Sequence, residues 1–254
     1  MVQAYCLQGF TLRNIDQYER DYLDNPFEAE LVKYRHRKTV ETLELLGPST
    51  ILEVGCGLVP LYDYFKTFKA LVIFEPSLKF ADAASEPSVK GVSVVNDELK
   101  LEYATDFDEK FDLIVISSLL HELENPLALL ECARGFLAEG GAIHINVPNS
   151  QSMHRVLAQK MGLINRLEER SDRQVRFQQH HTFSVKTLEE LVCSAGFEIL
   201  SSETFFIKPF THAQMQSLLD SGLITQAMLD GLYLLGEDMP GMGAEIVMNV
   251  RIAN

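Results

Sequence analysis

The chain has 254 residues, a formal net charge of −14 and a hydrophobic content of 46%. The acidic balance argues against general nucleic-acid binding, which needs a basic surface. The sequence contains no apolar run of about 18 residues or more, so we expect no membrane span. The length and composition fit one α/β domain over residues 1–254.

The cysteines indicate a reducing compartment. Cys6, Cys56, Cys132 and Cys193 are far apart in the chain and form no Cys-x-x-Cys pair. We therefore expect free thiols and no required metal. The first residues show no charged segment followed by a long apolar one, so we expect no signal peptide and a cytoplasmic location.

An N-terminal extension and a helix are expected over residues 1–46. Residues 1–25 are polar and turn-prone, whereas apolar residues between 27 and 46 recur at roughly helical spacing before Gly47-Pro48 ends the pattern. The helix carries a basic run around Tyr34, formed by Lys33, Arg35, Arg37 and Lys38. A charge run of this kind is usually a solvated face.

The most informative stretch is I-L-E-V-G-C-G at residues 51–57. The apolar run predicts a buried strand, and the two glycines allow a sharp turn in which the backbone lies close to a ligand. A strand, a turn and a helix in this order form a nucleotide-sized crevice at the carboxyl edge of a parallel sheet. We expect the helix near residues 60–67.

Two residues decide which nucleotide suits this turn. The dinucleotide pattern G-x-G-x-x-G needs a third glycine, but Pro60 stands there and has no N–H for a phosphate. Glu53, two residues before the first glycine, would repel a pyrophosphate and suits a cationic ligand. S-adenosylmethionine (SAM) carries an ammonium and a sulfonium and no phosphate, so the turn favours SAM over a nicotinamide dinucleotide.

Strands and helices alternate through the expected core, residues 47–149, which indicates a parallel sheet with helices on both faces. Glu75 ends the second strand about 20 residues after the first glycine, where an acid accepts both ribose hydroxyls of a bound nucleotide. The predicted strands are 50–54, 70–74, 92–95, 112–117 and 142–147, and further helices are expected near 77–84 and 126–138.

After residue 149 the alternation breaks, and residues 150–182 are expected to form a helical insertion. Ser184 predicts the N-cap of a helix over 185–195, and Gly196 its C-terminal glycine. The rest of the chain is predicted as a strand over 197–208, a second insertion over 209–243 that is helical at 211–235, and a last strand over 244–252. Insertions near the carboxyl edge of a sheet commonly cover the substrate.

Four landmarks in this order resemble those of the class I SAM-dependent methyltransferases. Residues 51–57 resemble their motif I, E/D-x-G-x-G, although Val59 replaces the third glycine common there. The second landmark is Glu75 at the end of the second strand, and the third is residues 110–121, which resemble the F-D-L-I strand and following loop of small-molecule methyltransferases. The fourth is the run 137–147, which resembles the L-x-x-G-G turn into their fifth strand.

The resemblance implies a fold and a cofactor site. The fold is α/β, with a doubly wound, mostly parallel seven-stranded sheet whose last strand is antiparallel. Asp97 or Glu98 would meet the adenine amino group, and Tyr34 or Arg35 would reach the SAM carboxylate. The expected cofactor-binding residues are Tyr34, Arg35, Glu53, Gly55, Cys56, Gly57, Glu75, Pro76, Asp97, Glu98, Ser117 and Ser118.

Histidines are the expected catalytic residues, because a hydroxyl acceptor needs a base and histidine is matched to neutral pH. His121 follows the fourth strand, where methyltransferases place residues near the methyl group. His180 and His181 end the first insertion, and one of them is an alternative base or substrate anchor. His144 lies inside a strand and is expected to be a core residue, whereas His154 is expected on the substrate side.

The first insertion is locally basic. The segment 148–197, which contains this insertion, resembles methyltransferases that modify sugars or other small polyhydroxylated metabolites. Arg166, Arg170, Arg173 and Arg176 recur at spacings that place them on one side of a helix. They form either a solvated face or a clamp for a phosphate or carboxylate, which the fork of arginine suits. The expected substrate-binding residues are His154, Arg173 and Arg176.

These observations predict an enzyme that transfers the SAM methyl group to a hydroxyl, or to an amine or carboxylate, of a small anionic metabolite. A sugar, a sugar nucleotide or a precursor of a polysaccharide or natural product is the favoured acceptor. We expect no nucleic-acid or membrane partner, and a homodimer is an open alternative. The competing functions are an NAD-dependent oxidoreductase, against which Glu53 and Pro60 argue, and a non-catalytic SAM-fold binding protein.

Overall fold

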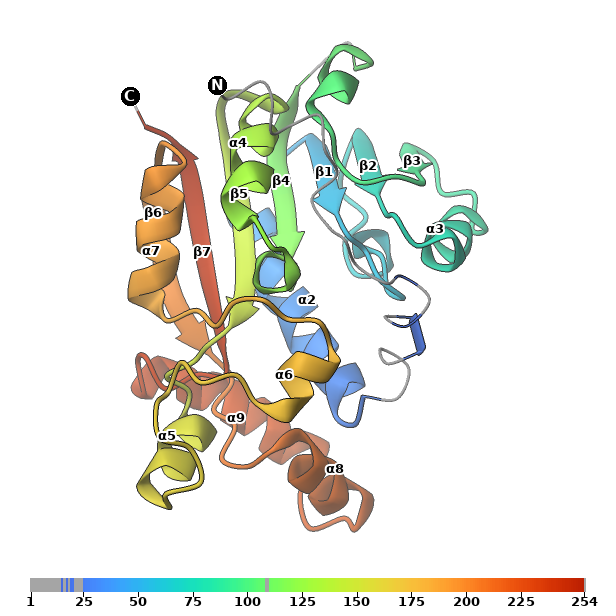
Figure 1. The fold of residues 1–254 in the computed structure, drawn as a ribbon. Coiled ribbons are helices and arrows are strands. Elements are labelled where there is room, and N and C mark those ends of the chain that lie inside the picture. The colour runs from blue at the N-terminus through green and yellow to red at the C-terminus, as the bar shows by residue number, and fades with distance from the viewer. Residues whose placement is uncertain (1–14, 16, 18, 21–24, 108–109, 254) are drawn as a thin grey trace.

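Seven strands form one sheet in the order β3-β2-β1-β4-β5-β7-β6 (Figure 1). The structure is a computed structural model that describes residues 15, 17, 19–20, 25–107 and 110–253, without the side chains of residues 172 and 173. Most of the expected N-terminal extension, including Cys6, lies outside these residues. The strands are β1 (Thr50–Val54), β2 (Ala70–Phe74), β3 (Val92–Val95), β4 (Phe111–Ser117), β5 (Leu137–Pro148), β6 (Phe197–Phe205) and β7 (Glu245–Ile252).

Helices flank the sheet and gather below its carboxyl edge, where α5, α6, α8 and α9 lie (Figure 1). Among the described residues, no helix is both long and apolar enough to cross a membrane. The helices are α2 (Glu28–Leu46), α3 (Leu78–Ser85), α4 (Pro126–Arg134), α5 (Met153–Lys160), α6 (Asp172–Arg176), α7 (Val185–Ser194), α8 (His212–Asp220) and α9 (Gln226–Asp238).

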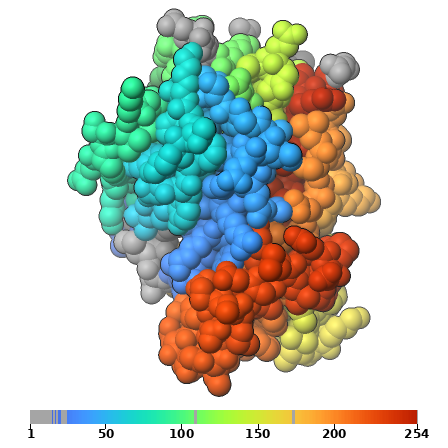
Figure 2. Space-filling view, turned by 180° about the vertical axis from the view of Figure 1, so that it is seen from behind, coloured from blue at the N-terminus to red at the C-terminus, as the bar shows by residue number. Residues whose placement is uncertain are grey.

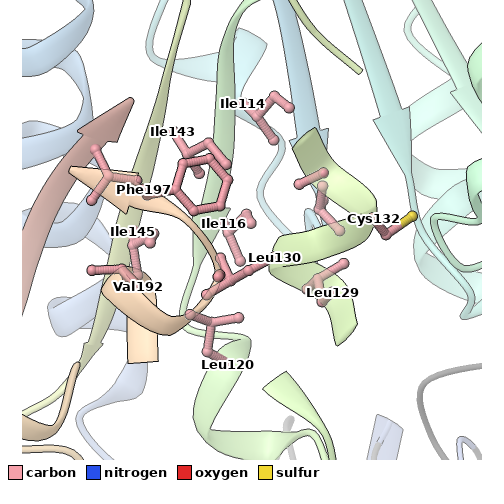
Figure 3. Close-up of a cluster of buried hydrophobic side chains, with 14 of the residues drawn as sticks. Ile114, Ile116, Leu120, Leu129, Leu130, Cys132, Ile143, Ile145, Val192 and Phe197 are labelled. Carbon is pink, nitrogen blue, oxygen red and sulfur yellow. The ribbon is translucent and has the colours of Figure 1, made fainter. Parts of the chain in front are cut away.

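The central strands are apolar on both faces because helices cover both sides of the sheet. In β1 and β4, Leu52 and Ile114 join the larger core cluster with α4 and α7, while Ile51 and Leu113 join a second cluster on the opposite face. Figure 3 shows part of the larger cluster, in which Phe197 lies beside the isoleucines of β4 and β5. The last two strands are antiparallel to each other, and β7 is antiparallel to β5. This is the expected class I methyltransferase sheet.

A third core cluster joins the start of α2 to the second insertion. Figure 2 shows α2 in blue against the orange and red helices α8 and α9. Tyr34 stacks on Tyr233 with ring centroids 5.5 Å apart. Its hydroxyl donates to Asp230 Oδ1 at 2.9 Å and accepts from Gln226 Nε2 at 2.9 Å. The chain thus brings segments about 200 residues apart together at one end of the sheet.

Most predicted elements are confirmed within a few residues. Ser184 is an N-cap whose side chain accepts from Thr187 N, and Gly196 has a φ of 79° after the helix, as the sequence predicts. The expected helix over 60–67 is wrong. Only a 3-10 turn forms, at Leu61–Asp63. Its first N–H, that of Leu61, donates to the Glu53 carboxylate, and Leu61 and Phe65 pack in the second core cluster.

The two insertions also differ from the expectation. The helical segment expected over 211–235 consists of α8 and α9, separated by a turn at Gly222 with a φ of 71°. In the first insertion only α5 and α6 are helical, and residues 161–171 between them form no helix. Arg166 and Arg170 therefore do not share a helical side with Arg176, because α6 begins only at residue 172.

Candidate active site

A cavity of about 800 Å³ runs along the carboxyl edge of the sheet. One half lies at the ends of β2 and β1 and is lined by Glu75, Glu53 and the glycine loop that follows β1. The other half lies beyond β4, where Ser150 and Glu245 line it. Open α/β sheets bind ligands at this edge, so we call the two parts the cofactor half and the acceptor half.

The glycine loop is held open by its own backbone and by Glu75. Gly55 and Gly57 have φ angles of 78° and 56°, a region that residues with a Cβ rarely adopt. Glu75 is buried, and its two oxygens accept from Gly57 N at 3.1 Å and from Ser77 N at 2.9 Å. Glu75 also lines the cavity, so its carboxylate can meet a bound ligand. Pro76 and Cys56, both named from the sequence, also line it.

Glu53 lies beneath this loop and accepts from Leu61 N at 3.1 Å. Burial raises its pKa to about 8, opposed by that hydrogen bond and reinforced by the nearby charges of Glu75 and Asp63. A cation bound in the cofactor half would favour the ionised form of Glu53. The carboxyl group is therefore suited to a positively charged ligand.

His36 is a cavity residue that the sequence did not single out. It projects from α2, stacks on Tyr64 with centroids 4.3 Å apart and donates to the Val59 backbone. Burial and the neighbouring Arg35 lower its pKa to about 4, so its imidazole is neutral at pH 7. The sequence around His36 does not indicate a cavity residue. Its contacts with Val59 and Tyr64 depend on how α2 packs on the segment after the glycine loop.

Asp97 and Glu98, the two residues predicted to contact adenine, have different surroundings in the structure. Glu98 lines the cavity. Asp97 does not, because its carboxylate bonds to Lys100 Nζ at 2.6 Å and to the Tyr103 hydroxyl. Tyr34 is likewise absent from the cavity wall, since its ring and hydroxyl are turned toward α9. Of these three residues, only Glu98 lies on the cavity wall.

His121 lines the cavity together with Ser117 and Ser118 at the end of β4. It is 2% exposed, and its Nε2 lies 3.9 Å from Glu122 Oε1. The carbonyl of His121 accepts from the backbone N–H groups of His180 and His181 at 2.9 and 3.0 Å. The first insertion therefore holds the histidine loop in place.

The two insertion histidines have different surroundings. His181 lines the cavity, and its Nε2 lies 3.2 Å from the Glu124 carbonyl. His180 is exposed and does not line the cavity, so it is not retained as a candidate base. His144 is the core residue expected, with Thr39 Oγ1 at 3.1 Å and Asn249 Oδ1 at 2.9 Å on its two ring nitrogens.

His154, Arg155 and Arg176 line the cavity from the first insertion. Arg155 is committed to the chain itself, donating to the Leu167 carbonyl through both Nε and Nη2. Arg176 lies at the exposed end of α6, with its guanidinium 5.8 Å from the Phe177 ring. The Arg173 side chain lies outside the described part of the molecule.

The acceptor half contains a buried ionic cluster, and Arg35 is its one member that was predicted from the sequence as a site residue. Arg35 Nη2 lies 2.6 Å from Glu28 Oε1, and its Nε lies 3.4 Å from Glu245 Oε1. Lys208 is 2% exposed and donates to His212 Nδ1 at 2.9 Å. Two apolar runs could have indicated Lys208 and Glu245, because each run contains one charged residue. The runs are F-F-I-K at 205–208 and A-E-I-V at 244–247. A lysine or glutamate in such a run is seldom fully buried unless it is paired.

A family model described as a methyltransferase domain matches residues 29–202, more than half of the chain. The chain belongs to this methyltransferase family. The match extends from α2 to β6 and includes the glycine loop, Glu75 and His121. This match favours a methyltransferase over the alternative considered from the sequence, an NAD-dependent oxidoreductase.

Other proteins resemble this methyltransferase more distantly. An uncharacterized protein of Methanocaldococcus jannaschii, MJ1123, is 25% identical over 193 residues, covering 75% of this chain and 84% of that protein. A SAM-dependent methyltransferase of Thermotoga maritima, named as a possible histamine N-methyltransferase, has a TM-score of 0.57 and 18% identity, covering 92% and 97% of the two chains. The N-methyltransferase NodS of Bradyrhizobium japonicum has a TM-score of 0.53 and 16% identity, covering 91% and 90%. At these identities the structures establish the fold.

SAM is the methyl donor of class I methyltransferases, and the cofactor half of the cavity fits it. Glu75 and Glu98 line this half, and a bound cation would favour the ionised form of Glu53, so the lining suits a sulfonium and an ammonium better than a pyrophosphate. Gly55 and Gly57 have positive φ angles and no side chains, so a ligand can approach the backbone closely at the end of β1. Within the described residues, no group of three or more His, Cys, Asp or Glu side chains is arranged to hold a metal ion.

Proposed function

We propose that this methyltransferase transfers the SAM methyl group to a hydroxyl of a small hydroxylated metabolite that carries an anionic group. Transfer to an amine or a carboxylate of such a molecule is the less favoured form of the same reaction. The observation that carries the proposal is one cavity that is lined by Glu75 and Glu98 at the cofactor half and also by the buried His121. Methyl transfer is an in-line displacement, so the enzyme chiefly aligns the acceptor with the methyl group.

The cofactor-binding roles follow from the cavity wall. Glu75 would accept the ribose hydroxyls, Glu98 would contact the adenine amino group, and Gly55 and Gly57 would let the backbone approach the methionine part. Ser117 and Ser118 would meet the methionine end from β4. Bound SAM supplies an activated methyl group on sulfur, and the chain's own residues position the acceptor.

His121 is proposed as the general base. An acceptor hydroxyl has a pKa far above 7, so it must lose its proton as the methyl group is transferred. The imidazole takes this proton at a ring nitrogen, and the Glu122 carboxylate 3.9 Å from Nε2 stabilises the resulting positive charge. His181 is the alternative base, because it lines the same cavity.

The anionic part of the acceptor is assigned to the exposed end of the cavity. Two residues of the first insertion line the cavity, the exposed Arg176 on α6 and the partly buried His154 on α5. Arginine recognises phosphate and carboxylate groups through paired hydrogen bonds. A sugar nucleotide or a sugar phosphate has an anion and several hydroxyls at a suitable separation, so this class of acceptor is favoured.

The test is calorimetric titration of the full chain with SAM, S-adenosylhomocysteine (SAH) and NADH, with Glu75→Ala as the variant. We expect SAM and SAH to bind at micromolar concentrations, and Glu75→Ala to abolish this binding while the protein stays folded. A methyl-release assay with sugar phosphates and sugar nucleotides then follows the SAM methyl group. Binding of NADH in place of SAM would refute the proposal.

A further inference from the structure

Glu245 has hydrogen-bonding capacity that the described residues leave unfilled. Its side chain lines the acceptor half and is 2% exposed. Oε1 lies 3.4 Å from Arg35 Nε, and the Asn146 side chain also hydrogen-bonds to the carboxylate. Within the described residues, Oε2 is buried with no hydrogen-bond partner. A buried carboxylate oxygen without a donor is costly, so a donor on a bound ligand would stabilise it.

Ser150, at the same edge of the sheet, also has a buried side-chain oxygen without a hydrogen-bond partner among the described residues. It is 3% exposed and lines the cavity, and its Oγ has no hydrogen-bond partner among the described residues. Its backbone N–H donates to the Phe183 carbonyl at 2.7 Å, which fixes the position of the residue. Glu245 pairs with Pro148 in the β5–β7 register, and Ser150 follows Pro148 by two residues. Both side chains therefore belong to the half of the cavity remote from Glu75.

The charges around this pair select a neutral ligand group. Glu28 and Glu245 are balanced by Arg35 and Lys208, all of them buried. An ammonium would bring a third positive charge into this cluster, and a phosphate would face two carboxylates. A hydroxyl donates one hydrogen bond and accepts others, so it can donate to Glu245 and accept from Ser150 without changing the charge.

The backbone beside the cluster is strained. Phe206 is fully buried and has a φ of 60°, which a bulky residue rarely adopts. Gly236 and Gly243 pack so closely on the Phe205 backbone that a Cβ on Gly243 would overlap it. This packing holds the turn that leads to Lys208. Strained residues held by their surroundings concentrate at ligand sites, which supports a binding role for this end of the cavity.

We propose that Glu245 and Ser150 form a subsite that anchors a neutral, hydroxyl-bearing part of the acceptor. The subsite rests on the proposed function, since it assigns one end of the acceptor whose anionic end was assigned to Arg176. It adds a selection rule: the group that reaches Glu245 is a hydroxyl or a vicinal diol, and neither an amine nor an anion.

The experiment measures binding of D-glucose and myo-inositol to the SAH-loaded full chain by saturation-transfer difference NMR. Glucosamine and glucose 6-phosphate serve as the cationic and anionic counterparts. We expect the neutral polyols to bind, and Glu245→Gln and Ser150→Ala each to weaken that binding about tenfold or more, as loss of a hydrogen bond to a charged or buried group does. Glu203→Gln is the matched control, because Glu203 pairs with Lys38 at the surface.

Several results would overturn the subsite. They are the absence of neutral-polyol binding, equal binding by wild type and the two variants, and tighter binding of glucosamine than of glucose. If Glu245→Gln does not fold, Ser150→Ala decides the question alone. SAH affinity is measured for each protein: failure of the wild type to bind SAH refutes the proposed function, whereas retained SAH affinity with unaltered polyol binding in the variants refutes only the subsite.

Discussion

The Glu75 carboxylate accepts a hydrogen bond from the backbone N–H of Gly57 at 3.1 Å, which ties the end of β2 to the glycine loop after β1. Its other oxygen accepts from Ser77 N at 2.9 Å. One side chain therefore shapes the loop and also presents acceptor oxygens to the cavity. Its contribution to cofactor binding and to loop order cannot be separated by deletion alone.

The substitution Glu75→Gln allows cofactor binding and loop order to be measured separately in one variant. The amide keeps the size of the side chain but replaces one acceptor oxygen with an NH₂ donor, which would face a backbone N–H. We expect the dissociation constant for SAH to rise about tenfold to 100-fold, with a loss of stability of about 1–2 kcal/mol. Calorimetry and urea unfolding measure the two effects. Unchanged SAH affinity would remove Glu75 from the cofactor site.

Glu98→Gln and Asp97→Asn form a matched pair of neighbours. Glu98 lines the cavity, whereas the Asp97 carboxylate is committed to Lys100 and Tyr103. We expect Glu98→Gln to weaken SAH binding about threefold to tenfold, because the adenine amino group loses a charged acceptor. Asp97→Asn should leave it within about twofold. The reverse order of effects would assign adenine contact to Asp97.

His121→Gln and His180→Gln test the base in the same way. His121 is buried in the cavity, and His180 is exposed outside it. Once an acceptor is found, we expect His121→Gln to lower kcat about 100-fold or more without altering SAH affinity, because general-base catalysis contributes roughly 10²–10⁴-fold. His180→Gln should be nearly inert. A full kcat in His121→Gln would transfer the role to His181.

Glu53 makes stability depend on pH. Its pKa is about 8 in the folded chain, against an ordinary value of 4.5. Between these values the folded state holds a proton that the unfolded state has released, so the free energy of unfolding falls as the pH rises toward 8. The loss from pH 6.5 to 8.5 should be about 2 kcal/mol, at 1.36 kcal/mol per pH unit.

The comparison of wild type with Glu53→Gln isolates this effect. In the variant the decline between pH 6.5 and 8.5 should disappear, while Glu44→Gln, at an exposed position of α2, should retain it. Urea unfolding at several pH values gives the free energies. His36 and His144, whose pKa values are lowered to about 4, do not interfere, because they change stability only below about pH 6.5. A decline of the same size in Glu53→Gln would contradict the assignment.

Gly243→Ala and Gly231→Ala should change stability in opposite directions. A Cβ at Gly243 would overlap the Phe205 backbone, so we expect a loss of about 2 kcal/mol or more. Gly231 lies inside α9 with nothing near its added Cβ, so alanine should stabilise the protein by about 0.5–1 kcal/mol. Thermal unfolding measures both. Tolerance of Gly243→Ala would show that the turn before Lys208 is not held by this contact.

The sheet and the cofactor half could be predicted because their signals are local. An apolar run of strand length, a glycine pair and an acid after the second strand stand within about 25 residues of one another. The helix predicted after the glycine loop was wrong: the segment forms only a 3-10 turn at Leu61–Asp63, whose first N–H donates to Glu53 from the preceding strand.

The sequence by itself determined the family, the order of the strands and the acidic character of the cofactor half, since these depend on residues close together in the chain. Only the tertiary structure places Glu98 and His121 on the cavity wall and leaves Asp97 and His180 off it, and only it assembles Arg35, Lys208 and Glu245 into one buried cluster. The burial of this cluster is set by the packing of α2 against β7 and the segment that follows β6. Their residues are separated by up to about 200 positions, and no local pattern records which side chains meet.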